Sequence, residues 1–236
     1  MGHTYRQVVG DSINMCGRYT SRFSDKQNLP ASVVDIPRFK ARYNIAPQQK
    51  AAIIRMLDGQ PSYEELRWGF RPSWLKDKNK AQINARAETL FTKPMFKHSA
   101  LHRRCLVLAS GWYEWQQGEH GKQPYVFHLQ DDPLFAFAGI WTRWHTQGQE
   151  QEDSDSYAIV TTDANPVAAP VHRRMPVVLA KKTCAAWLDE AAQDIKTLSS
   201  LLTPYSGDDL HAYPVSTYVN SPQHTGEECI KPLQEL

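Results

Sequence analysis

Residues 104–116 of this 236-residue chain read RCLVLASGWYEWQ. Apolar and aromatic residues dominate the stretch, which favours strands, and Ser110-Gly111 can turn the chain between a strand at Arg104–Ala109 and one at Trp112–Gln116. Gly118 to Gly121 predicts a hairpin loop that leads into a further strand at Tyr125–Leu129. Strands that follow one another without intervening helices favour an antiparallel sheet.

The same strand pattern recurs along the chain. Further strands are predicted at Ala51–Leu57, Glu65–Trp68, Leu134–Ile140, Tyr157–Thr161 and Val177–Leu179. Helical patterns are fewer and are predicted at Ala85–Phe91, Met95–Ala100, Lys181–Ala192 and Asp194–Leu202. The polar segment Gln147–Ser156 reads as an exposed loop, and no segment resembles a linker. We therefore expect an α+β fold: a β-rich single domain with a mainly antiparallel, barrel-like sheet core and peripheral short helices.

Composition excludes several classes of protein. With 41% hydrophobic and 22% charged residues, the chain is close to the globular average, so disorder and coiled coil are not expected. No run approaches the roughly 20 apolar residues of a membrane helix. Residues 1–14 also lack the apolar core of a signal peptide, which points to the cytoplasm.

Charge is distributed unevenly along the sequence. Residues 16–105 contain 18 Lys/Arg against 7 Asp/Glu, a net charge of +11, and the rest of the chain has a net charge of −9. A basic first half suggests a polyanionic partner such as nucleic acid. The alternative is a mixed surface in which the two halves interleave once folded.

Four cysteines are present, without C-x-x-C pairs or the spacing of a zinc site. Cys105 lies in an apolar run and reads as a small buried residue. Cys16 instead follows Met15 and precedes Gly17-Arg18. If translation starts at Met15, removal of the methionine exposes both an α-amine and a thiol on Cys16, and this pair condenses with aldehydes to a thiazolidine. The alternative is a buried structural cysteine in a first strand.

Aromatic and basic residues alternate in the stretch Arg67–Trp74. Trp68 and Phe70 could stack on nucleobases while the neighbouring arginines neutralise phosphates. A loop that packs in the core explains the same composition equally well.

A second candidate for nucleic-acid contact is Ile83–Thr89. Asn84 and Arg86 are two residues apart, so they share a face if the segment is extended. Asn84 could then hydrogen-bond a sugar while Arg86 holds a phosphate. Alternatively, Asn84 caps the predicted helix at Ala85–Phe91.

Two acid–base candidates lie in the acidic half. Glu114 is flanked by aromatic residues, and an apolar setting raises a Glu pKa and suits it to proton transfer; the alternative is a solvated position on an edge strand. His172 precedes the pair Arg173-Arg174 and could move protons near neutral pH. An exposed loop histidine is the ordinary alternative.

Eight short motifs, in this order, resemble those of the SOS response-associated peptidase (SRAP) family. They are MCGR at 15–18, RYNIAP at 42–47, RWG at 67–69, INARAET at 83–89, GWYEW at 111–115, FAGIW at 137–141, TTDAN at 161–165 and HRRMP at 172–176. The resemblance covers about residues 16–220, nearly the whole chain, and eight ordered motifs are far more specific than one.

The resemblance implies a protein of the DNA damage response that senses abasic sites in single-stranded DNA. Cys16, as the mature N-terminus, would form a thiazolidine crosslink with the ring-opened sugar. Asn84 would orient the linkage, Glu114 would exchange protons with the α-amine, and His172 would act on the sugar ring oxygen. Contacts to DNA are implied for Arg18, Trp68, Phe70, Arg86, Thr162 and Arg173, with Asn44 and Pro47 shaping the pocket. No metal or cofactor is implied, and a monomer suits a groove that clamps one strand.

Residues 1–14 depart from the family pattern, in which the cysteine is residue two. A Cys16 nitrogen still bound to residue 15 is an amide and forms no Schiff base. Three explanations stay open: Met15 is the true initiator, which we prefer; the leader is a cloning remnant; or it is a propeptide that the domain at 15–236 removes itself. In the last case the Cys16 thiol attacks the preceding carbonyl with help from Glu114 and His172.

Two other functions remain as alternatives. The first is a thiol peptidase that cleaves other proteins with the same three residues, Cys16, Glu114 and His172. The second is a module that recognises modified DNA without a covalent bond, for which binding should be reversible and salt-sensitive.

Overall fold

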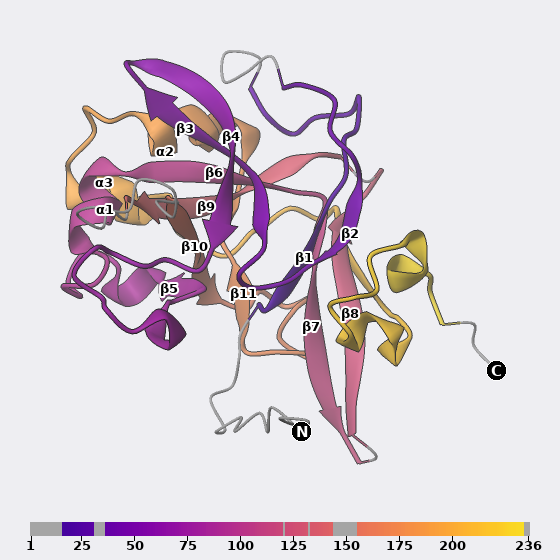
Figure 1. The fold of residues 1–236 in the computed structure, drawn as a ribbon. Coiled ribbons are helices and arrows are strands. Elements are labelled where there is room, and N and C mark those ends of the chain that lie inside the picture. The colour runs from indigo at the N-terminus through magenta and orange to yellow at the C-terminus, as the bar shows by residue number, and fades with distance from the viewer. Residues whose placement is uncertain (1–15, 31–35, 120, 132, 144–154, 234–236) are drawn as a thin grey trace.

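The computed structural model describes residues 16–30, 36–119, 121–131, 133–143 and 155–233. Strands outnumber helices in these ranges and divide between two sheets (Figure 1). The α+β, β-rich class predicted from the sequence is confirmed. The leader at 1–14 and most of the predicted loop at 147–156 fall outside the described residues.

The smaller sheet has five antiparallel strands. Their order is β13 (Leu210–Pro214), β8 (Gly121–Leu129), β7 (Gly111–Gly118), β1 (Arg18–Ser21) and β2 (Arg42–Ile45). The β7–β8 pair closes at Gly118 opposite Gly121, which confirms the predicted hairpin. Of these five strands, the sequence patterns above had predicted only β7 and β8.

The larger sheet has eight strands. Its order is β11 (Arg174–Pro176), β10 (Ser156–Asp163), β4 (Gln60–Trp68), β3 (Lys50–Leu57), β6 (Arg104–Ala109), β9 (Phe135–Thr142) and β12 (Val178–Leu179), with β5 (Asn84–Arg86) beside β10. β10 also pairs with β9, so the sheet curls back on itself. The return contact of β10 with β4 is limited to two residue pairs, and the sheet is therefore not a closed barrel.

Helices are short: the α-helices lie beside the larger sheet, and the C-terminal 3-10 turns lie beside the smaller sheet (Figure 1). They are α1 (Lys97–His102), α2 (Lys181–Leu188) and α3 (Ile195–Ser200), with 3-10 turns η1 (Lys78–Lys80), η2 (Ala87–Thr89), η3 (Thr217–Asn220) and η4 (Glu227–Ile230). The helix predicted at Ala85–Phe91 is wrong: its start is strand β5, and only η2 follows. Hydrogen bonding to β10 outweighs the local helical preference there, so Asn84 is a strand residue and no helix cap.

The stretch at 104–116 contributes one strand to each sheet. β6 lies between β3 and β9 and is buried at all six positions, which explains its continuous apolar sequence. At Ser110 the chain crosses to the smaller sheet, so the predicted turn is a crossover and no hairpin. Glycine is required at 111, because a Cβ there would lie 2.6 Å from the carbonyl oxygen of Phe127.

Aromatic side chains join the two sheets. The Tyr19 hydroxyl of β1 lies 2.6 Å from the Tyr157 hydroxyl of β10, and the Tyr19 ring packs edge-on against Trp68 of β4. Trp112 of β7 stacks on Phe127 in the same core. One face of β7 therefore points into the interior between the sheets. No helix among the described residues is long and apolar enough to cross a membrane.

Candidate functional site around Cys16

Cys16 and Glu114 meet at the start of β1. The backbone nitrogen of Cys16 donates a hydrogen bond of 2.8 Å to Oε1 of Glu114, across 98 residues of sequence, and both residues are 1% exposed. Cys16 has a φ of 44°, a left-handed conformation that few non-glycine residues adopt. The chain immediately before β1 is thus turned so that the Cys16 nitrogen faces the carboxyl group.

Glu114 faces the interior because side chains alternate along β7. It shares a face with Trp112, two residues earlier, which packs in the core between the sheets. β7 lies between β8 and β1, so the alternative of a solvated edge-strand position is wrong. Burial raises the pKa of Glu114 well above its usual value, although the hydrogen bond from Cys16 opposes this shift. A raised pKa suits a carboxyl group to proton transfer.

His172 lies beside Cys16 and Glu114 as the third residue of the candidate site. Its Nδ1 lies 3.9 Å from Oε2 of Glu114, and the backbone N–H of Arg174 lies 3.1 Å from the same nitrogen. The Arg174 carbonyl oxygen also lies 3.1 Å from Nδ1, so the Arg174 backbone can hold the ring in either neutral tautomer. Burial, with the positive charges of Arg173, Arg174 and Lys122 nearby, lowers the pKa of His172 despite its backbone hydrogen bond. The ring is therefore largely neutral at pH 7, and it is no free loop histidine.

Arg174 lies at this site and is a residue that the sequence reasoning missed. Its guanidinium group is nearly buried and binds Glu88 (2.6 Å), Asp163 (2.7 Å) and the Thr161 carbonyl (2.7 Å), while its backbone holds the His172 ring. It therefore joins β11, β10 and η2 and fixes the acid–base histidine. Had the strand been predicted to begin at residue 174 instead of 177, its alternation would have placed Arg174 facing inward.

Asn84 and Arg86 lie on β5, parallel to β10. Asn84 pairs with Ile159 and Arg86 with Thr161, so both residues lie on the strand that leads toward the Arg174 cluster. Arg86 is exposed and Asn84 is half-buried. The predicted extended conformation of this motif is confirmed, and it places the two side chains on one face of β5.

Trp68 and Phe70 do not have the exposure that stacking on bases requires. Both are buried, with 0% and 1% exposure. The Trp68 ring nitrogen donates to the Ile83 carbonyl at 2.8 Å, and the Phe70 ring packs against Phe96 at 5.6 Å. The alternative of a core role is therefore correct, because apolar burial between the sheets outweighs any surface function of these rings.

Arg18 and Asn44 lie on the other side of the smaller sheet. Arg18 pairs with Tyr113, the neighbour of Glu114, and so points away from the Cys16 site. Its guanidinium group donates to Asn44 Oδ1 and to the carbonyls of Val219 and Asn220. Asn44 also donates to carbonyls of this C-terminal segment. In the structure both residues hold the C-terminal segment against β1 and β2. The phosphate contact by Arg18 and the pocket role of Asn44 stay predictions.

The remaining predicted residues fall into two groups. Thr162 is 5% exposed and pairs with Met175 of β11, whereas Arg173 is exposed beside His172. Arg173 is thus available to an anion, whereas Thr162 is buried in the pairing of β10 with β11. Pro47 is half-buried in the turn between β2 and β3. The residue that follows it, Gln48, packs on Gly69.

The thiol of Cys16 is protonated at neutral pH. Burial, with the charge of Glu114 nearby, raises its pKa well above the usual value. A resting thiolate nucleophile is therefore disfavoured, and chemistry that begins at the nitrogen is favoured. Within the described part of the chain, no three His, Cys, Asp or Glu side chains are grouped to hold a metal ion.

Residues 15–222 match the family described as SOS response associated peptidase (SRAP). The chain belongs to the SRAP family. It is 37% identical over 229 residues to the abasic site processing protein YoqW of Bacillus subtilis, covering 92% of this chain and 99% of that protein. It is 31% identical over 230 residues to the abasic site processing protein HMCES of Gallus gallus, covering 84% of this chain and 68% of that protein.

Solved structures share the SRAP fold seen here. A protein from Bacteroides thetaiotaomicron superimposes with a TM-score of 0.75, over 92% of this chain and all of that one, at 24% identity. A phage-related protein from Bordetella bronchiseptica gives a TM-score of 0.66 over 85% of this chain and 94% of its own, at 28% identity. The SRAP match begins at Met15, immediately before the cysteine on which the site is built.

Proposed function

We propose that this SRAP protein captures abasic sites in single-stranded DNA as a covalent thiazolidine on Cys16. The observation that carries the proposal is the 2.8 Å hydrogen bond from the Cys16 nitrogen to buried Glu114, with His172 beside the same carboxyl group. Three relatives named abasic site processing proteins, YoqW, HMCES and YedK, support the choice of lesion. When Cys16 is the first residue, its α-amine takes the place of the amide nitrogen beside Glu114.

The condensation uses the amine, the thiol and the carboxyl group in sequence. Glu114 accepts a proton from the Cys16 ammonium, and the neutral amine adds to the C1′ aldehyde of the ring-opened sugar. The protonated Glu114 then gives its proton to the departing hydroxyl group, and water leaves to form a protonated Schiff base. The Cys16 sulfur adds to the same carbon while the thiol proton goes to Glu114, which closes the five-membered ring. The product is the adduct of aldehyde and cysteine less one water.

His172 and Asn84 act on the sugar in this proposal. The imidazole of His172 can donate a proton to the ring oxygen as the closed sugar opens, and the same imidazole can assist reversal. Asn84 orients the linkage by hydrogen bonding from β5. Both positions need the sugar outside the base stack, which is why a single strand suits this site better than a duplex.

The same residues could remove the leader. The Cys16 thiol gives its proton to the ionised Glu114 as the sulfur attacks the carbonyl of residue 15. Glu114 then passes this proton to the departing Cys16 nitrogen, and water hydrolyses the resulting thioester, with His172 assisting. The alternative function suggested by the family name is hydrolysis of other proteins. One clamped strand per site suits a monomer, which would act in the compartment that holds the DNA.

A denaturing gel tests the function directly. Protein that begins at Cys16 should shift single-stranded DNA carrying one abasic site to a band that survives denaturation, and Cys16→Ala should lose that band. No band from correctly processed wild-type protein would sink the proposal. A shifted band on a native gel that is absent from the denaturing gel would favour the non-covalent module. Cleavage of unrelated proteins by the same preparation would favour the peptidase.

Arg86→Ala should weaken DNA binding and lower its salt dependence. Arg86 is exposed at the end of β5 and is available to a phosphate, so its loss should reduce the slope of log K against log salt by about 1. Fluorescence anisotropy across a salt series measures the slope. Lys196→Ala on α3 is the control, since it removes one exposed positive charge elsewhere on the molecule. Equal slopes for Arg86→Ala and wild type would remove Arg86 from the DNA site.

A further inference from the structure

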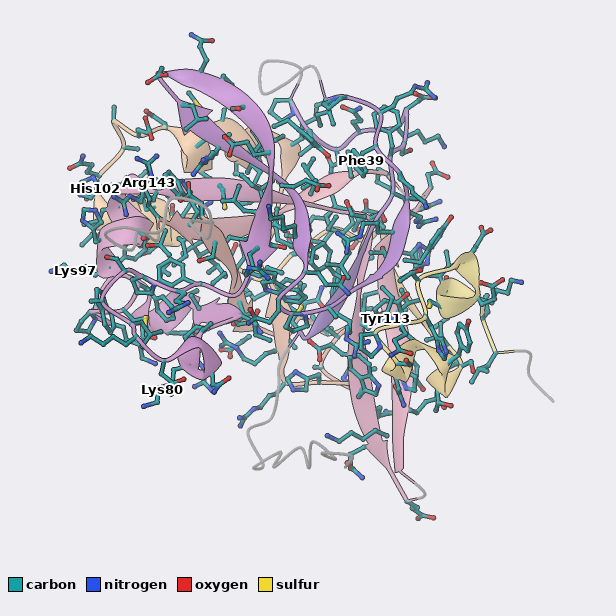
Figure 2. The ribbon with its side chains drawn as sticks, viewed as in Figure 1. Phe39, Lys80, Lys97, His102, Tyr113 and Arg143 are labelled. Atoms are coloured by element: carbon teal, nitrogen blue, oxygen red, sulfur yellow. The ribbon has the colours of Figure 1, made fainter. Side chains whose placement is uncertain are left out.

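The face of β7 that holds Glu114 also holds Gln116. Side chains alternate along a strand, so the residues at 112, 114 and 116 share one face, on which Trp112 packs between the sheets. Tyr113 and Trp115 point to the opposite face and pack with the C-terminal segment, beside which Figure 2 shows Tyr113. Gln116 is half-buried and therefore continues the row of side chains that faces the candidate site.

Gln116 binds the loop that presents His172. Its side-chain Nε2 donates a hydrogen bond of 3.0 Å to the carbonyl oxygen of Pro170, two residues before the histidine. Gln116 and Pro170 are 54 positions apart in the sequence, so this bond is a tertiary contact. It joins the strand that holds Glu114 to the loop that holds His172.

The loop is held together by its own hydrogen bonds. Asn165 accepts a hydrogen bond from the Ala168 nitrogen at 2.9 Å through its side-chain oxygen, and its amide nitrogen donates to the Tyr205 carbonyl at 2.8 Å. The His172 nitrogen then donates to the Ala168 carbonyl at 2.9 Å. Because the loop is a compact unit, a force applied at Pro170 also acts on the position of His172.

Glu114 and His172 come from different sheets. Glu114 lies on β7 of the smaller sheet, whereas His172 precedes β11 of the larger sheet, to which the Arg174 backbone holds its ring. The 3.9 Å between His172 Nδ1 and Glu114 Oε2 is too long for a hydrogen bond, so the pair needs other contacts to stay together. The Gln116–Pro170 bond supplies such a contact between the two sheets.

We propose that Gln116 is a positioning residue that keeps His172 beside Glu114 by tying the Pro170 carbonyl to β7. Its part in the reaction rests on the proposed function, in which His172 acts on the sugar ring oxygen. Loss of the tie should let the loop and its imidazole move away from β7 while Glu114 stays in place. A small displacement of an acid–base group is enough to slow the step that it serves.

Two neighbouring glutamines provide a test with a matched control. At saturating natural abasic single-stranded DNA, Gln116→Ala should slow single-turnover crosslinking about fivefold, the effect of one neutral hydrogen bond. Gln116→Met should slow it equally, because methionine has a similar length but no donor. Gln117→Ala should crosslink at the wild-type rate, since Gln117 is exposed and donates to the adjacent Gly118 carbonyl.

Two further comparisons separate positioning of His172 from a general loss of stability. In a His172→Ala background, Gln116→Ala should cause no additional slowing, because it acts through the imidazole. DNA with an acyclic aldehyde that cannot close into a ring needs no acid at a ring oxygen, so Gln116→Ala and wild type should crosslink it at equal rates. Equal slowing by Gln116→Ala with and without His172, or on both DNAs, would overturn the proposal.

A measurement without DNA distinguishes failure of this proposal from failure of the proposed function. Burial lowers the pKa of His172 despite its backbone hydrogen bond, with smaller contributions from three cations, Arg173, Arg174 and Lys122. Gln116→Ala changes no charge but should expose the ring, so NMR titration of the imidazole should find this pKa raised toward its usual value. Gln117→Ala should leave the pKa unchanged.

The two failures then give different results. If wild type forms no crosslink but Gln116→Ala raises the pKa of His172, only the covalent function is wrong. If wild type crosslinks and neither the rate nor this pKa responds to Gln116→Ala, only the positioning role is wrong.

Discussion

Crosslinked protein will always begin at Cys16, and replacing its sulfur will make the adduct reversible. The hydrogen bond of 2.8 Å places the Cys16 nitrogen beside the proton acceptor Glu114, but an amide at that position has no lone pair to attack an aldehyde. Intact-mass measurement should therefore find the chain from Cys16 to Leu236 plus DNA less one water. An adduct that retains residue 15 would contradict the amine mechanism.

Cys16→Ser separates the two reactive atoms of this residue. A chain that begins with the substituted serine keeps the α-amine, so a Schiff base can form, but it lacks the sulfur that closes the stable ring. We expect no band on a denaturing gel unless borohydride is added, which reduces the imine to a stable amine. Cys105→Ser is the matched control, because Cys105 is buried within β6 and should leave crosslinking intact. A stable adduct of the Cys16→Ser protein without reduction would show that the sulfur is dispensable.

Glu114→Gln should slow crosslinking by about 100- to 10,000-fold, the usual contribution of a general acid–base group. The amide of glutamine can accept the hydrogen bond from Cys16 but cannot carry the proton. The rate of wild type should depend on pH through the raised pKa of Glu114, and the residual rate of Glu114→Gln should lack that dependence. Single-turnover crosslinking at saturating DNA from pH 5 to 9 measures both.

The same substitution should stabilise the fold at high pH. Because burial raises the pKa of Glu114 in the folded state, its contribution to stability is fully present below the unfolded pKa of about 4.3 and is lost as pH rises through the folded pKa. Glutamine does not titrate, so the melting temperature of Glu114→Gln minus that of wild type should increase with pH.

Glu88→Gln provides a control of opposite sign. Partial burial would raise the pKa of Glu88, but hydrogen bonds from Arg174 outweigh this effect and lower it. Its contribution to stability is therefore present above the unfolded pKa and is lost as pH falls through the folded pKa, so Glu88→Gln should melt below wild type at neutral pH. A melting difference for Glu114→Gln that does not change with pH would mean that Glu114 does not titrate as inferred.

Residues 104–116 show how far the sequence can predict this fold. Both strands follow from local composition, since β6 is apolar after its first residue, Arg104, and β7 is rich in aromatic residues. Their assignment to different sheets does not follow, because it depends on which distant strands supply hydrogen bonds. β1, β2 and β13 are four or five residues long and half polar, so little in their own sequence marks them as strands.

The sequence predicted those residues of the candidate site whose side-chain chemistry is distinctive. Cys16, Glu114 and His172 stand out by reactivity, and the structure brings all three together. Trp68, Phe70 and Arg18 were predicted as DNA contacts from residue type alone, whereas their burial and side-chain direction depend on strand register, which a single sequence does not reveal. Arg174 was missed for the same reason, since only the fold brings Glu88 and Asp163 to it.

The uneven charge along the sequence also changes meaning in three dimensions. β10, from the acidic half, lies against β4 and β5 of the basic half, so the two halves interleave in one sheet. Arg55 of the basic half is neutralised by Glu64 and by Asp155 of the acidic half. The positive charges that stay available to a polyanion are those of exposed side chains. Arg86 and Arg173 are the two of these that were predicted from the sequence.

The bonds from Arg18 to Val219 and Asn220 span 201 and 202 residues, so the strand that follows the reactive cysteine is secured by a segment that is synthesised long after it. A nascent chain whose residues 219 and 220 are still in the ribosome exit tunnel has Arg18 and Asn44 without these carbonyl partners. Its cysteine strand is therefore incompletely anchored until this segment emerges. The order of synthesis thus delays full anchoring of β1 until the strands of both sheets have been made.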